Sequence, residues 1–160
     1  MGKMHIKIRE LEGSDFSGVF ALAAGIYAEN PKATFFSAEP TRETFDSIFG
    51  EKRRGAEGGY AVDVVAVYGS RVIGECDIAE KRPGVGVLGI IISKRYRRRG
   101  AGRMLLDAAS AKARGMGMVM LEACVDRENA AATAFFYNNG FEKAEGGAGS
   151  STMTFRKRIR

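Results

Sequence analysis

The feature that most constrains the fold is a basic, glycine-containing segment between an apolar stretch and a stretch rich in Ala and Leu. Val85–Ser93 is the most apolar part of the chain, and we expect it to form a central strand. Residues 97–102 read Arg-Arg-Arg-Gly-Ala-Gly, and Gly100–Arg114 has the composition of a helix. Glycines let a ligand approach the backbone, a first helical turn offers N–H groups to an anion, and arginines bind phosphate oxygens. This order predicts a pyrophosphate cradle; the alternative is a solvated basic loop with an ordinary glycine cap.

The hydrophobic pattern along the rest of the chain predicts the order β-α-α-β-β-β-α-β-α-β-β. A chain of 160 residues with this alternation is expected to form a single domain over residues 1–160, of the α/β (α+β) class. The expected strands are 4–9, 60–68, 71–79, 85–93, 116–125, a short one after Gly140-Phe141, and 152–159. The expected helices are one from Ser14 or Asp15 to Asn30, then 41–54, 100–114 and 129–138, with loops at 55–59 and 146–149.

The composition argues against several classes of protein. With 45% hydrophobic and 28% charged residues, the chain is typical of a folded soluble protein. It has no apolar run near the ~20 residues of a membrane span and no recognisable signal peptide, so we expect a cytoplasmic protein that does not enter a membrane. Two cysteines, Cys76 and Cys124, and one histidine, His5, form neither a disulfide framework nor a metal site, so no metal is expected.

The formal net charge of +6 has a location in the sequence. No acidic residue lies between positions 94 and 103, and the cations there are Lys94, Arg95, Arg97, Arg98, Arg99 and Arg103. These six charges equal the net charge, so the rest of the chain is formally neutral. One concentrated site favours a phosphate-bearing small molecule over an extended nucleic acid, for which a longer basic and aromatic surface is expected.

A second glycine pattern competes with this interpretation. Gly84–Gly89 matches the dinucleotide fingerprint G-x-G-x-x-G. That fingerprint requires a preceding strand and a helix that begins on it, whereas here a turn precedes it and the strand residues Ile90–Ile92 follow. We therefore reject dinucleotide binding at this position, and a P-loop motif is absent from the sequence.

Two motifs together resemble the Gcn5-related N-acetyltransferase (GNAT) superfamily. Its motif [Q/R]-x-x-G-x-[G/A] is matched by Arg97, Gly100 and Gly102. Its later pattern V-x-x-x-N-x-x-A, followed by G-F, is matched by Val125, Asn129, Ala132 and Gly140-Phe141, and the likeness covers essentially the whole chain. The branch that acetylates ribosomal-protein N-termini is the most similar. The resemblance implies a mixed central sheet of about seven strands, flanked by about four helices and splayed between the strands near 85–93 and 116–125.

The resemblance also implies acetyl-CoA as the cosubstrate. Its pyrophosphate would lie on the backbone N–H groups of 97–102, its pantetheine arm along the strand edge at 90–92, and a backbone N–H near Ile92 would hold the oxyanion. Asn129 would contact the pantetheine arm or hold the splayed strand, or else cap a helix. The expected cofactor-binding residues are Ile90, Ile91, Ile92, Arg97, Arg98, Arg99, Gly100, Ala101, Gly102, Arg103, Asn129 and Phe136.

The expected reaction is direct acetyl transfer to a primary amine, which needs a base for the amine and an acid for the thiolate. The sequence departs from the family here, because Cys124 stands where the related branch has a Glu, and Phe136 stands where many members have a Tyr. Glu122, on the same strand face as Cys124, is the expected base, with Glu75 as second choice or water as intermediary. Tyr137 is the expected acid, although it lies one helical step beyond Phe136. Cys124 is expected to be a small packing residue and not a nucleophile, because no base partner is evident. The alternatives are that Glu122 is only a polar surface or paired residue and that Tyr137 only packs.

The acceptor side of the site is less constrained by the sequence. The resemblance places Tyr27, Glu29, Phe35 and Phe36 around the acceptor, with an ordinary helix-pair core as the alternative. The leading hypothesis is an N-acetyltransferase that acts on a protein N-terminus, a lysine or a small amine. Dimers are common in the family, so by analogy the resemblance is compatible with a homodimer. The rival is a catalytically weak acetyl-CoA-binding sensor.

Overall fold

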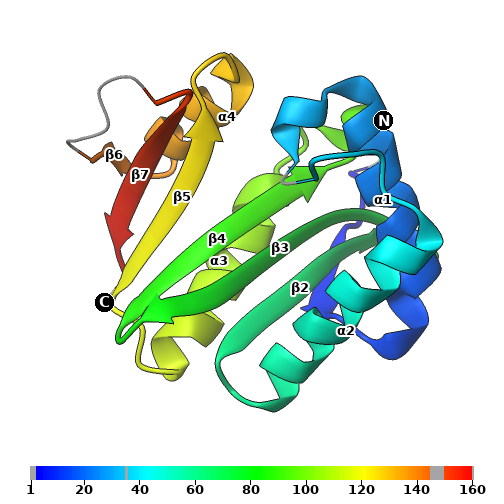
Figure 1. The fold of residues 1–160 in the computed structure, drawn as a ribbon, viewed down its shortest axis with the longest axis horizontal. Helices are drawn as coiled ribbons and strands as arrows, with labels where there is room; N and C mark the ends of the chain where they lie inside the picture. The colour runs from blue at the N-terminus through cyan, green and yellow to red at the C-terminus, as the bar shows by residue number, and fades with distance from the viewer. Residues whose placement is uncertain (1–2, 35, 145–149, 160) are drawn as a thin grey trace.

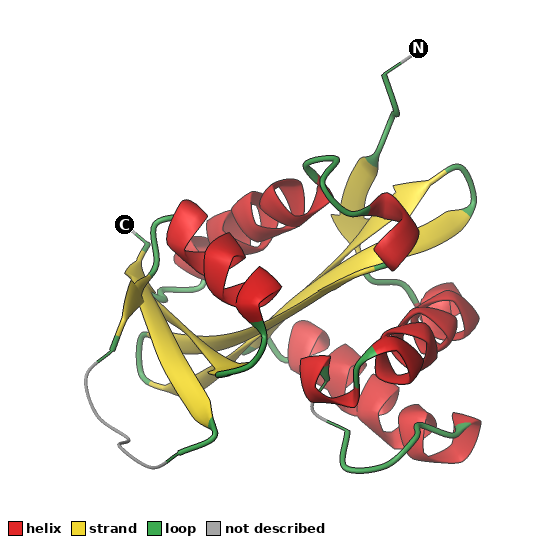
Figure 2. Cartoon of the chain, turned by 90° about the horizontal axis from the view of Figure 1, so that it is seen from above, coloured by secondary structure: helices red, strands yellow, loops and turns green. Residues whose placement is uncertain are grey.

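A computed structural model describes residues 3–34, 36–144 and 150–159, which form one mixed sheet with helices on both faces (Figures 1 and 2). The strand order is β1-β2-β3-β4-β5-β7-β6. The strands are β1 Lys7–Glu10, β2 Ala61–Tyr68, β3 Arg71–Arg82, β4 Val85–Ile92, β5 Met120–Asp126, β6 Glu142–Lys143 and β7 Thr152–Arg158. The helices are α1 Phe16–Glu29, α2 Arg42–Glu57, α3 Ala101–Gly115 and α4 Ala130–Asn138, with 3-10 turns at Gly13–Asp15, Pro31–Ala33 and Lys94–Tyr96. The expected α/β fold with a seven-stranded mixed sheet and four helices is confirmed.

Each face of the sheet has its own hydrophobic core. Alternation along the strands sends Val64 toward one face and Val65 toward the other. The larger core lies against α3 and α4 and includes Leu105, Leu106 and Phe136. The smaller core lies against α1 and α2, where phenylalanine rings pack edge to face. Acceptor-side residues are therefore expected under α1 and α2, on the face opposite α3.

The sheet opens between its two central parallel strands. β4 and β5 pair only at Val85↔Met120, Gly86↔Leu121 and Val87↔Glu122, and β5 then follows β7 along its whole length. Beyond Val87 the two strands diverge, as Figure 1 shows in the separation of the green and yellow arrows. The splay that the family resemblance implied is confirmed.

Several expected boundaries were wrong by a few residues. α2 continues through the expected loop to Glu57, because Gly55 lets Tyr60 and Ala61 pack against the helix. β3 continues beyond Ala79 to Arg82 because its ladder with β4 extends to that residue. β5 begins at Met120 and not at Met116, because Gly117 adopts a φ of +90° in the turn after α3. The expected loop at 146–149 lies outside the described residues.

The described residues contain no helix that is long and apolar enough to cross a bilayer.

Candidate functional site

The basic loop between β4 and α3 has an unusual backbone. Arg98 has a φ of +62°, the one positive value outside glycine in the described ranges, and Gly100 has a φ of +84°. Tyr96 is buried beneath the loop and fixes its start. When residues with left-handed backbone conformation alternate with right-handed ones, their successive N–H groups point toward a common side. Such a concave row of N–H groups is called a nest and binds anions.

From Arg98 onward, the N–H groups of this loop find no acceptor in the part of the chain that the structure describes. The six consecutive N–H groups of residues 98–103 donate no hydrogen bond to any described residue. The hydrogen bonds of the helix begin with the N–H of Met104, which donates to the carbonyl of Gly100 at 3.1 Å. A Cβ on Gly100 would meet nothing within 4 Å, so the space in front of it is open. These groups fit the pyrophosphate of a nucleotide cofactor, since a helix N-terminus and a nest both attract anions.

Arg97 is hydrogen-bonded to three other residues. Its N–H donates to Lys94 at 3.4 Å, and its guanidinium binds Glu29 of α1 at 2.5 and 3.0 Å and the Ile92 carbonyl at 3.1 Å. The N–H of Arg97 has a long bond to Lys94, and its place in the cradle stays a prediction. The side chain of Arg97 ties α1 to the end of β4.

The packing of α4 against α3 explains why position 102 is a glycine. A Cβ at this position would lie 2.9 Å from the ring of Phe135 on α4. Phe135 therefore forms a wall of the gap between α3 and α4, beside the N-terminus of α3. Sequence reasoning missed this residue, although it precedes Phe136 by one step of about 100° on the same expected helix.

The free edge of β4 supplies further donors. Ser93 N–H donates to Ile73 of β3 at 2.8 Å. Since successive N–H groups of a strand point to opposite edges, those of Ile92 and Ile90 point toward the opening beside β5. The side chain of Ile91 packs against the core under α1 and α2, and those of Ile90 and Ile92 pack against the core under α3. This edge can hold an extended amide chain and a developing oxyanion.

Asn129 caps α4, as one of the sequence-based alternatives proposed. Its side-chain oxygen accepts from the N–H of Ala132 at 3.1 Å. Its amide NH2 finds no acceptor within the described part of the chain, so the cap leaves it available to a ligand.

Asn129→Ala is expected to cost about 1 kcal/mol of folding stability because it removes the cap. Asn129→Asp keeps an accepting oxygen and the cap but loses the NH2 donors. Urea unfolding and acetyl-CoA calorimetry on both variants separate the two roles. A loss of affinity in the Asp variant without a loss of stability indicates a contact with the cofactor, whereas equal affinity limits Asn129 to capping.

Comparison with protein-family models gives one decisive match. The model described as the acetyltransferase (GNAT) family matches residues 24–141, which is most of the chain. The chain belongs to the GNAT family of acetyltransferases. No curated protein matches it at a significant level.

Solved structures of GNAT and related acetyltransferases share the fold. A ribosomal-protein-alanine N-acetyltransferase from Brucella melitensis is 22% identical with a TM-score of 0.79, over 96% of this chain and 99% of that one. A PaiA N-acetyltransferase from Thermoplasma acidophilum, in complex with coenzyme A, is 21% identical with a TM-score of 0.79, over 97% and 99%. A putative acetyltransferase, yncA, from Salmonella typhimurium, with acetyl-CoA, is 15% identical with a TM-score of 0.79, over 97% and 94%.

Glu122, the expected base, is held by two arginines. It lies at the last paired rung of β4 and β5 and is 5% exposed. Arg82 binds its carboxylate at 2.5 Å and Arg156 at 3.2 Å. The hydrogen bond from Arg82 is the main cause that lowers the Glu122 pKa, which makes this carboxylate a weaker base. The pairing that we considered as an alternative is present, and a catalytic role for Glu122 stays a prediction.

Cys124 and the α4 aromatics occupy the positions at which this chain departs from the GNAT pattern. Cys124 is exposed on β5, so its expected packing role was wrong: its face of β5 carries no covering element at that point. Phe136 is buried against Phe141 and Phe155. Tyr137, two residues after Phe135 on α4, is 51% exposed, and its ring contacts that of Phe155. A pantetheine contact for Phe136 and an acid role for Tyr137 stay predictions.

The expected acceptor wall is partly assembled. Phe36 packs against Phe45 of α2, and Glu29 is engaged by Arg97. Tyr27 is half-buried on α1, and Phe35 lies outside the described residues. Lys32, in the turn after α1, binds Glu128 after β5 at 2.5 Å, so one exposed ion pair joins the two sides of the opening.

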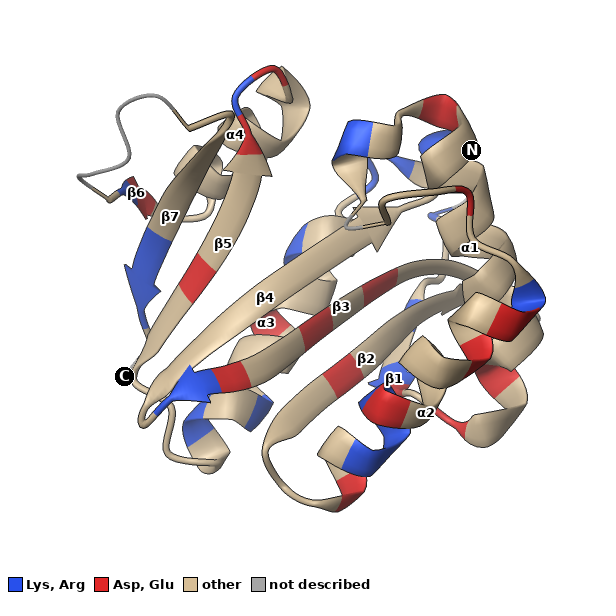
Figure 3. Cartoon of the chain, viewed as in Figure 1, with Lys and Arg blue, Asp and Glu red and all other residues tan. Residues whose placement is uncertain are grey.

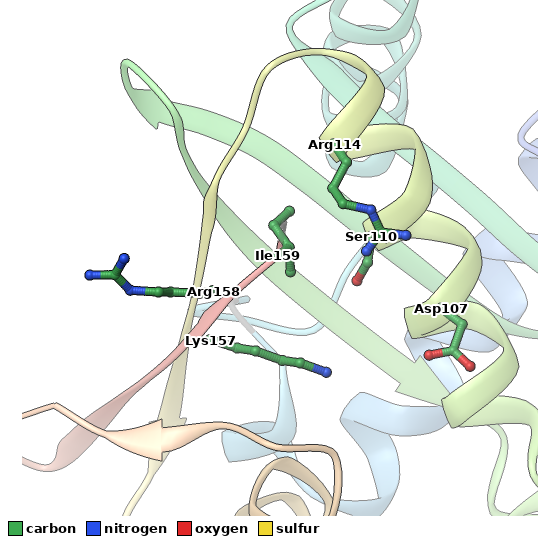
Figure 4. Close-up of a pocket in the computed structure, with 6 residues that line it drawn as sticks. All are labelled: Asp107, Ser110, Arg114, Lys157, Arg158 and Ile159. Carbon is green, nitrogen blue, oxygen red and sulfur yellow. The ribbon is translucent and has the colours of Figure 1, made fainter.

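A separate pocket lies between α3 and the end of β7 (Figure 4). It has a volume of about 280 Å³ and is lined by Asp107, Ser110, Arg114, Lys157, Arg158 and Ile159. None of the expected site residues lines it, and its α3 residues come from the part of the helix beyond the N-terminal turn. We therefore place the functional site at the opening between β4 and β5.

Proposed function

We propose that the protein transfers an acetyl group from acetyl-CoA directly to a primary amine. The observation that carries this proposal is the row of six N–H groups at residues 98–103, which have no acceptor within the described residues and lie beside the open edge of β4 in a GNAT fold. Two of the similar structures, from T. acidophilum and S. typhimurium, are complexes with coenzyme A and acetyl-CoA, which supports the same cosubstrate here.

In this proposal each segment of the site has a distinct role. The N–H groups from Arg98 to Arg103, including those of Arg99, Gly100, Ala101 and Gly102, bind the pyrophosphate, and the Arg98 and Arg99 side chains add charge-assisted bonds. The edge at Ile90–Ile92 receives the pantetheine arm, with the amide of Asn129 beside it. The Ile92 N–H stabilises negative charge on the carbonyl oxygen. When bound, the thioester supplies the activated acetyl group.

The acceptor is proposed to be a primary amine of a peptide, a protein or a small molecule. The B. melitensis structure carries the name of a ribosomal-protein-alanine N-acetyltransferase, which supports testing peptide N-termini first. Glu122 is retained as a candidate base and Tyr137 as a candidate acid. Replacement of each by Gln and Phe, respectively, tests these assignments.

One observation favours a second candidate, a catalytically weak acetyl-CoA-binding sensor. Cys124 and Phe136 occupy two positions where related enzymes carry acid–base side chains, and the nearby Glu122 is neutralised by two arginines. A sensor binds acetyl-CoA without turning it over in the presence of amines.

The test is acetyl-CoA calorimetry followed by a coenzyme A release assay with an amine panel of N-terminal peptides, free lysine, diamines and small aromatic amines. Binding with turnover is the expected result. Binding without turnover supports the sensor, and absence of binding overturns both proposals.

A further inference from the structure

A buried cluster of charged groups lies between α2 and the sheet, outside the residues assigned above. Lys52 of α2 reaches Asp63 of β2 at 3.3 Å and, on β3, Glu75 at 3.4 Å and Asp77 at 3.0 Å. Figure 3 shows the acidic positions of β2 and β3 as red bands on these two adjacent strands. One ammonium group therefore faces three carboxyl groups.

Two of these carboxyl groups are buried and short of hydrogen-bond donors. Asp63 and Glu75 are each 5% exposed. Both side-chain oxygens of Asp63 and Oε2 of Glu75 receive no hydrogen bond from any described residue, since the one good bond of Lys52 goes to Asp77. Two buried carboxylates without donors are costly, and a proton shared between them removes one charge and creates a donor. In agreement, burial raises the pKa of Asp63 well above its usual range, and Glu75 raises it further, against the opposing effect of Lys52.

The register of the sheet places Glu75 on the strand next to β4, whose free edge faces the proposed reaction site. Glu75 lies directly opposite Ile91 of β4, so the two side chains share the face under α1 and α2. Ile92, the next residue, directs its N–H toward the opening at β5. Asp77 lies opposite Gly89, which has no side chain to cover the strand between the cluster and the opening. Glu75 is thus the carboxyl group of the cluster that lies beside the oxyanion donor.

We propose that the Asp63–Glu75 pair is the proton acceptor of the acetyl transfer, with Glu75 the catalytic residue nearest the amine. The inference rests on the proposed function. The acceptor ammonium gives one proton to the pair, the amine lone pair forms the C–N bond, and the C–S bond breaks to release the thiolate. The second amine proton goes to the thiolate, and the pair returns its proton to water through Asp77, which is half-exposed. Lys52 is a positioning residue that holds the pair and sets its proton affinity.

Charged groups from three elements lie around Glu75. α2 presents Lys52, β2 presents Asp63, and Asp77 is the neighbour on β3. The thiol of Cys76 lies behind the strand, on the opposite face. β4 presents Gly89 and Ile91, and α1 presents the apolar side chains of Val19 and Ala23, so none of these adds a charge.

Glu75→Gln is expected to lower kcat/KM for the best amine of the panel by at least ~100-fold, with acetyl-CoA affinity unchanged, because general-base catalysis contributes that much or more. The matched control is Glu51→Gln, an exposed carboxylate next to Lys52 on α2, which is expected to keep its activity. In Lys52→Gln the rise of kcat/KM toward alkaline pH should move to higher pH, because removal of a positive charge makes the pair bind its proton more tightly.

A second measurement does not need turnover. The infrared spectrum of the protein without cofactor at pH 7 should contain a protonated-carboxyl band that disappears in Asp63→Asn. Absence of this band in the wild type overturns the inference. So does a Glu75→Gln variant with normal kcat/KM, which leaves the proposed acetyl transfer intact. Failure of the wild type to bind acetyl-CoA or to acetylate any amine overturns the proposed function instead.

Discussion

Gly100→Glu is expected to weaken acetyl-CoA binding by at least ~100-fold, measured by calorimetry. Gly100 lies at the entrance of α3 with a φ of +84°, among the N–H groups that have no acceptor in the described residues. A carboxylate there accepts those N–H groups and repels the pyrophosphate, so two effects act in the same direction. Because a Cβ at this position meets nothing within 4 Å, the substitution does not disturb neighbouring side chains.

Gly100→Asn is the matched control for backbone strain. Asn tolerates a left-handed backbone better than other non-glycine residues and adds no charge, so a small loss of affinity, within about fivefold, is expected. Thermal unfolding of both variants checks that they fold. If Gly100→Glu binds acetyl-CoA as tightly as Gly100→Asn, the pyrophosphate does not lie on this loop.

The strand, basic loop and helix that make up the proposed cradle could be predicted from the sequence because they are local. The apolar strand, the arginines, the glycines and the helix follow one another within 85–114, and each acts through its own backbone. The positive φ of Arg98 was not foreseen, since no glycine marks it. The participation of Phe135 was not foreseen either, because it depends on how α4 packs on α3.

Pairs that are distant in the sequence escaped prediction. The pairing of the Arg97 guanidinium with Glu29, 68 positions away, was not foreseen. The helix expected over 41–54 continues to Glu57, and Lys52, which lies within it, reaches toward carboxyl groups of the sheet. Glu75 was named as a candidate base but Asp63 was not, because the two carboxyl groups meet at Lys52 only when α2 is packed on the sheet.

The Asp63–Glu75–Lys52 cluster also makes a prediction about stability. Lys52→Met is expected to lower the free energy of unfolding by about 3 kcal/mol at pH 7, since removing one partner of a buried ion pair leaves uncompensated charge. The surface pair between Lys112 and Glu10, at 2.6 Å, is the control, and Lys112→Met should cost less than ~1 kcal/mol. Urea unfolding measures the free energy of unfolding of the two variants. They are matched because each replaces an ammonium group by the same apolar side chain.

The pH dependence of this loss follows from the direction of the pKa shift. Burial alone lowers the Lys52 pKa, but the charges of Glu75, Asp77 and Asp63 outweigh it and raise the pKa above its ordinary value. A raised pKa in the folded state means that the contribution of Lys52 is complete below the unfolded pKa of about 10.4 and disappears only as pH rises through the folded value. The difference between wild type and Lys52→Met should therefore shrink only at pH values above about 10.4. A difference that does not begin to shrink there contradicts the ion-pair account and indicates lost packing of the Lys52 stem instead.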